Sequence, residues 1–96
     1  VGFTTSQEIM KQNCDLMPNV HFQDICVAGV VSSLAYRFVG DTQKMTDFCF
    51  LVNSQNQESC FRQLGTALID WGINSEGIEK TCNKLPLEQA RWCKNS

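Results

Sequence analysis

One short pattern occurs three times along the chain: CDLMPNVHFQDIC at residues 14–26, CFLVNSQNQESC at 49–60 and CNKLPLEQARWC at 82–93. In each stretch, the third residue after the first cysteine is apolar and the fourth breaks helices or forms turns. These breakers are Pro18, Asn53 and Pro86. Successive copies lie 33–35 residues apart, a period typical of stacked helix–turn–helix units.

The cysteines of each stretch flank a predicted tight turn between antiparallel helices. Such a turn can bring the two side chains together. Among the connectivities that six cysteines allow, the threefold pattern therefore selects Cys14–Cys26, Cys49–Cys60 and Cys82–Cys93. An even number of regularly spaced cysteines in 96 residues also favours a secreted, periplasmic or other oxidising compartment.

The segments around the breakers have the three-to-four-residue apolar spacing of helices. Clean strand-like alternation does not occur, so the sequence predicts an all-α fold. We expect helices over residues 6–16, 20–39, 42–52, 55–71 and 75–84, and a last one from Pro86 onward.

Side chains near the breakers predict how the two long helices begin and which face they bury. Asn19 is the expected N-cap of the first long helix, and Ser54 with Gln57 fits a capping box at the second. Gly29 and Gly65 lie mid-face and are expected to allow close helix approach. The expected buried stripe of the first long helix is Phe22, Ile25, Cys26, Val30, Leu34 and Phe38.

Composition indicates one small domain, residues 1–96, and disfavours several functions. The net charge is −2 and no basic run occurs, so a nucleic-acid surface is not expected. The longest apolar run, residues 25–31, is too short to span a bilayer. Zinc ligands usually come in close pairs, but the chain has no Cys-x-x-Cys and a single histidine, His21. We therefore expect no metal and no cofactor.

The period and layout resemble tetratricopeptide-type and Sel1-like αα-hairpin repeats over residues 6–93. The resemblance implies a short α-solenoid-like stack of hairpins that binds another protein or a peptide and carries out no catalysis. The pattern begins on a short helix and stops inside a longer one. It therefore predicts either a piece of a longer array or a homodimer formed through the repeat ends.

Two residue pairs at equivalent repeat positions are the candidate binding residues. Tyr36 and Arg37 follow Cys26 by ten and eleven residues, and Asp70 and Trp71 follow Cys60 by the same steps. Tyr, Arg and Trp are enriched at interface hot spots, so we expect partner contact along this face of the long helices. The competing interpretation places Trp71 in the core and Arg37 at a solvated helix end.

Three other functions are also compatible with the sequence. One is an inhibitor or immunity protein that blocks a partner enzyme. A second is a carrier of a small apolar ligand, which needs an enclosed cavity. The third rests on the two Cys-x10-Cys pairs, which resemble the twin-cysteine helical hairpins of the mitochondrial intermembrane space. That alternative would pair Cys49 with Cys93 and Cys60 with Cys82, although Pro86 interrupts one of its helices.

Overall fold

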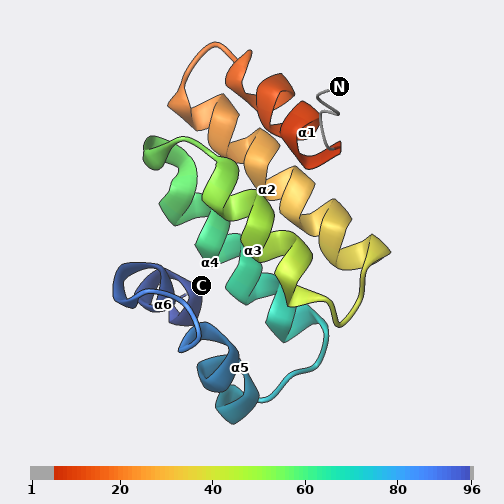
Figure 1. Cartoon of the computed structure of the whole chain (residues 1–96), viewed down its shortest axis with the longest axis vertical. Coiled ribbons are helices and arrows are strands. Elements are labelled where there is room, and N and C mark those ends of the chain that lie inside the picture. The colour runs from red at the N-terminus through yellow and green to blue at the C-terminus, as the bar shows by residue number, and fades with distance from the viewer. Residues whose placement is uncertain (1–5, 96) are drawn as a thin grey trace, which may run out of the picture.

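The computed structural model describes residues 6–95, which form six helices and no strand (Figure 1). This confirms the all-α prediction, and every predicted helix is present with ends within two residues of those expected. The helices are α1 (Ser6–Asp15), α2 (Val20–Arg37), α3 (Thr42–Leu51), α4 (Ser54–Asp70), α5 (Ser75–Cys82) and α6 (Leu87–Lys94).

The helices pack around α4. The two long helices α2 and α4 lie side by side and make the largest contact in the molecule, and α6 packs on the other side of α4. Helices α1 and α3 pack against α2 and against each other, and α3 also contacts α4. The backbones of α5 and α6 lie close to each other and to α4, but neither comes close to the backbone of α1, α2 or α3 (Figure 1). The last hairpin therefore reaches the other helices through α4.

The three predicted disulfides are all present: Cys14–Cys26, Cys49–Cys60 and Cys82–Cys93. Each joins the last turn of one helix to the second turn of the next, which in the short α6 is also its last turn. Their Cα atoms lie 5.4–5.6 Å apart, within the usual range for cystines. The twin-cysteine alternative is wrong, because it requires Cys49–Cys93 and Cys60–Cys82. Three intramolecular disulfides indicate a non-reducing compartment.

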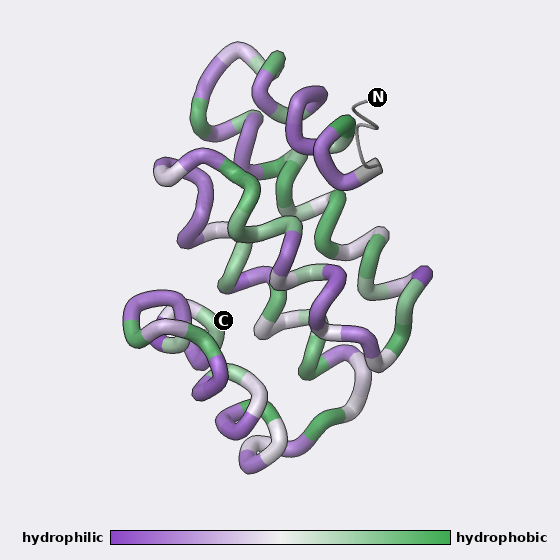
Figure 2. Tube along the Cα trace, in the orientation of Figure 1, coloured by the Kyte–Doolittle hydropathy of each residue, from purple (hydrophilic) through white to green (hydrophobic). Residues whose placement is uncertain are grey.

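The buried face of α2 differs from the predicted stripe. Leu34 is buried as expected, but Phe22, Ile25 and Phe38 are exposed, and the helix instead buries Val27, Val31 and Ala35. The physical reason is that α2 is apolar on several sides, as Figure 2 shows along most of its length. Periodicity alone then fits more than one stripe, and packing against α4 selects among them. The apolar core outside the cysteines is centred on Val27, Val31, Leu34, Met45, Phe48, Phe61, Leu64 and Leu68.

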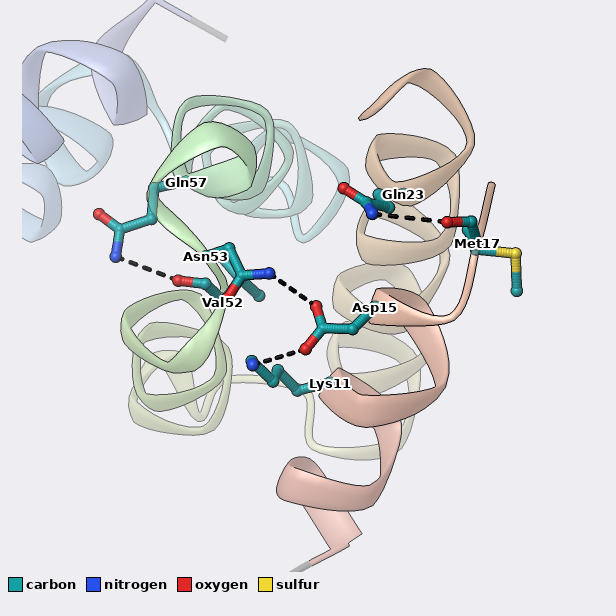
Figure 3. Close-up of polar contacts among 7 residues, drawn as sticks. All are labelled: Lys11, Asp15, Met17, Gln23, Val52, Asn53 and Gln57. Atoms are coloured by element: carbon teal, nitrogen blue, oxygen red, sulfur yellow. Dashed lines mark hydrogen bonds and ion pairs between the residues drawn. The ribbon is translucent and has the colours of Figure 1, made fainter. Parts of the chain in front are cut away.

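Asn19 caps α2 as predicted, since its side chain accepts a hydrogen bond from the Phe22 amide at 3.0 Å. The capping box at Ser54 and Gln57 is wrong. Helix α4 begins at Ser54 itself, and Gln57 donates to the Val52 carbonyl oxygen at 3.4 Å (Figure 3).

The residue before Ser54 has a long-range role instead. Asn53 donates from Nδ2 to Asp15 Oδ1 at 3.0 Å, and Lys11 pairs with the other oxygen of the same carboxylate (Figure 3). These contacts hold the end of α1 against the turn between α3 and α4.

Both Gly40 and Gly72 have positive φ values, 87° and 80°, which suit the left-handed turns that follow α2 and α4.

Candidate binding surface

Three of the four predicted binding residues line one depression. It has a volume of about 260 Å³ and lies between the C-terminal halves of α2 and α4. Tyr36 borders it from α2, and Asp70 and Trp71 border it from α4; its other lining residues are Ser32, Ala35, Val39, Gln63 and Ala67.

Arg37 lies elsewhere. It lines a separate depression of about 240 Å³, together with Met10 and Phe38. Ala35 and Tyr36 both border the depression beside α4, and Arg37 lies about 200° around the helix from Ala35, so its side chain points away from α4. The structure therefore groups Tyr36, Asp70 and Trp71 and separates Arg37 from them.

Trp71 forms the end wall of the depression. Its side chain packs against the apolar core, and its indole Nε1–H donates to the Ala35 carbonyl oxygen at 3.1 Å. Trp71 is thus partly a core residue and partly a surface residue, because one part of its ring packs on the core and another lines the depression. Tyr36, by contrast, is 87% exposed and is free to contact a partner.

A second depression continues along the same two helices toward their N-terminal ends. It has a volume of about 380 Å³ and is lined by His21, Asp24, Ile25, Ala28, Ser59, Arg62, Gln63 and Thr66. Gln63 borders both depressions and donates from Nε2 to Ser32 Oγ across the gap at 3.1 Å. We call the two depressions together the α2–α4 furrow. It runs from His21 to Trp71 and has this hydrogen bond as a cross-link at its middle.

Sequence reasoning missed the residues that make the furrow hollow. Ala28 and Ala35 on α2, and Ala67 on α4, are too small to fill the space between the two helices. Ile25 was assigned to the buried stripe, yet it is 56% exposed and lines the furrow. A signal for this face was present in the sequence, since positions 25, 28, 32, 35 and 39 follow a three- and four-residue spacing on α2.

Most charged groups around the furrow already have partners. Asp24 accepts a 2.7 Å hydrogen bond from Asn56, a side chain only 2% exposed on α4. Arg62 bonds Glu58 at 3.0 Å and the Asn95 carbonyl oxygen at 2.7 Å.

Asp70 is different. Within residues 6–95 its carboxylate forms no hydrogen bond or ion pair, and it is the last residue of α4. An anion at a helix C-terminus is unfavourable, because the backbone carbonyls there carry partial negative charge. Asp70 therefore offers an unpaired negative charge beside the apolar end of the furrow.

Free thiols and clusters of metal-ligating side chains are not found among the described residues. All six cysteines are disulfide-bonded, and residues 6–95 hold no group of three or more His, Cys, Asp or Glu side chains placed for a metal ion. Across the same residues, no helix has both the length and the apolar character needed to cross a membrane. Comparison with known proteins finds no family model, no curated sequence and no solved structure that matches this chain.

Proposed function

We propose that this chain is an extracytoplasmic, non-catalytic module of stacked αα-hairpins that binds a segment of a partner protein in the α2–α4 furrow. The tetratricopeptide-like repeat is part of the proposal. Its support is the threefold pattern of disulfide, turn and helix, together with the side-by-side order of α2, α4 and α6. The secreted or periplasmic location rests on the three disulfides.

The observation that carries the proposal is the exposed apolar rim along a hollow between two long helices. Ile25, Tyr36 and Val39 are all exposed, and they line the furrow from the α2 side. Exposed apolar groups that cluster in this way favour an interaction site, whereas scattered ones need no explanation. Tyr36 and Trp71 are of the residue types that dominate binding energy when an interface covers them.

The chemistry of the furrow defines the ligand. The small floor residues leave room for apolar side chains of an extended or helical segment. The unpaired carboxylate of Asp70 favours a basic residue at the Trp71 end. The expected ligand is therefore a peptide segment with two or more apolar side chains followed by Lys or Arg.

Selection from a random peptide display library against the immobilised domain tests this proposal. We expect selected peptides to share that pattern, and the double substitution Tyr36→Ser with Val39→Ser to weaken binding at least about tenfold. Arg37→Ser is the matched control, because Arg37 is next in sequence but lies outside the furrow; it should leave affinity within about twofold. Selected peptides that bind equally well to the double variant would contradict the proposal.

The carrier of a small apolar ligand remains the second candidate. Its support is a depression of about 550 Å³ at the α4–α6 end, a volume within the range of small-ligand sites. The interior offers little room for a ligand, since Met45, Phe48 and Phe61 are fully buried in the core. Displacement of a fluorescent fatty acid tests the carrier: tight, stoichiometric binding would favour it.

A further inference from the structure

A second apolar hollow lies at the other side of α4, away from α2. It is the 550 Å³ depression, formed where the end of α4, the start of α5 and the end of α6 meet. Three isoleucines supply its apolar surface, and polar side chains surround them; the lining residues are Ile69, Ile73, Asn74, Ser75, Ile78, Glu79 and Lys94. None of these residues borders the α2–α4 furrow.

The hollow lies beside the part of α4 that α6 does not cover. Helix α6 has 8 residues, whereas α4 has 17, so α6 lies along only the first half of α4. The Trp92 ring lies 6.4 Å from that of Phe61, and Arg62 donates a hydrogen bond to the Asn95 carbonyl oxygen. Ile69 lies two turns further along the same side of α4 as Arg62, and it is 53% exposed.

On α2, the position equivalent to Ile69 is covered by the next long helix. Aligning Cys26 with Cys60 places Ala35 of α2 at the position of Ile69 on α4. Ala35 is only 8% exposed, because the end of α4 lies against it and Trp71 bonds its carbonyl oxygen. On α4 the equivalent position carries a larger apolar side chain with no helix over it.

We propose that this hollow binds a short amphipathic helix of a partner protein, which lies on α4 as an extension of the line of α6. The helix would cover Ile69, Ile73 and Ile78 with apolar side chains spaced three or four residues apart. This inference rests on the repeat register proposed above and is independent of peptide binding in the α2–α4 furrow.

Size favours a helical segment over a second copy of the chain, and the bordering charges define which side chains that segment should carry. Seven residues line the hollow, whereas a stable interface between two globular proteins uses about 20–30 residues on each side. Glu79 and Lys94 border the hollow with opposite charges. A partner helix with a basic residue facing Glu79 and an acidic residue facing Lys94 would match both.

The second half of α4 supplies a probe, since it already covers the equivalent position on α2. The peptide RQLGTALIDWG, residues 62–72, is capped at both ends, labelled with fluorescein and held helical by a hydrocarbon staple between positions 62 and 69. Both stapled positions are exposed on α4. We expect saturable binding by fluorescence anisotropy, and Ile69→Lys in the domain should weaken it at least about tenfold.

Two controls separate this site from others. Leu87→Lys changes an exposed leucine on α6 that does not line the hollow, and it should leave affinity within about twofold. Tyr36→Ser with Val39→Ser disables the furrow and should also leave this peptide bound, so failure of one site is distinguishable from failure of the other.

Three results would overturn the proposal. The first is a stapled peptide of scrambled sequence that binds as tightly as the probe. The second is binding that Ile69→Lys does not change. The third is a domain that sediments as a dimer and becomes monomeric on Ile69→Lys, which would assign the hollow to a second copy.

Discussion

The indole Nε1–H of Trp71 donates a 3.1 Å hydrogen bond to the carbonyl oxygen of Ala35, which joins the end of α4 to the last turn of α2. Ala35 lies in the last turn of α2, where backbone carbonyl oxygens lack a hydrogen-bond donor within the helix. The bond therefore satisfies that group and closes the end of the furrow in one contact.

Substitutions of Trp71 should separate the contribution of its hydrogen bond to stability from that of its packed ring. Trp71→Phe keeps an aromatic ring but removes the donor, and we expect it to lower the free energy of unfolding by about 0.5–1.5 kcal/mol. Trp71→Ala also removes the packed ring and should cost about 2–4 kcal/mol. Urea unfolding followed by far-UV circular dichroism measures both. If Trp71→Phe unfolded at the same urea concentration as the natural protein, the hydrogen bond would carry no stability.

Asp70 should be unfavourable for folding and favourable for binding. Asp70→Asn removes an anion from the C-terminus of α4, so we expect a gain of at most about 0.5 kcal/mol at low ionic strength and less in salt. The same change should weaken binding of a peptide that carries a basic residue at the Trp71 end. Asp41→Asn is the matched control: Asp41 precedes the N-terminus of α3, where a negative charge is favourable, and its loss should not stabilise. A stabilising Asp70→Asn with unchanged peptide affinity would argue against a role in binding.

The Asn56–Asp24 hydrogen bond should matter more than the Gln63–Ser32 bond, although both link α4 to α2. Asn56 is 2% exposed, so Asn56→Ala leaves the partly buried Asp24 carboxylate without its donor and should cost about 1–3 kcal/mol. The Gln63 bond lies near solvent, where water replaces it, and Gln63→Ala should cost less than about 1 kcal/mol. Thermal unfolding of the two variants makes the comparison, and equal losses would contradict it.

The Cys82–Cys93 disulfide should be the one on which local structure depends most. Helices α5 and α6 have 8 residues each, a length that is marginal for an isolated helix, and outside their own pair they contact only α4. Replacement of both cysteines by alanine should therefore unfold this hairpin while α2 to α4 stay folded.

Hydrogen exchange with mass spectrometry measures this directly. Amides of residues 75–94 should lose protection, whereas those of α2 and α4 should keep most of theirs. The variant lacking Cys49 and Cys60 is the control, because that disulfide lies between α3 and α4 at the centre of the packing. Its loss should reduce protection throughout, and uniform loss in both variants would contradict the local effect.

The sequence predicted the helices and disulfides well because both depend on local signals. Each cysteine pair brackets a Pro or Asn turn, and those turns set where helices begin and end. The faces of the helices were harder to predict. Helix α2 is apolar on several sides, so the exposure of Phe22 and Ile25 was settled only by where α4 packs.

Gly29 is a second case in which the sequence did not predict how the helices pack. It was expected to allow close helix approach, yet nothing lies within 4 Å of the position that a Cβ atom would take there. The separation of Tyr36 from Arg37 depends on which side of α2 packs against α4, since the same 100° step leaves Asp70 and Trp71 on one depression. The hollow over Ile69 likewise depends on packing, because it is set by how far α6 extends along α4.

The most direct test of the furrow is to map a bound peptide by NMR. A peptide selected on the domain is titrated into the uniformly labelled protein, and amide shifts are followed residue by residue. We expect the largest changes on Ile25, Ala28, Ala35, Tyr36 and Trp71. Changes that instead gather around Arg37 and Phe38, or around Ile69 and Ile78, would contradict the furrow as the binding surface.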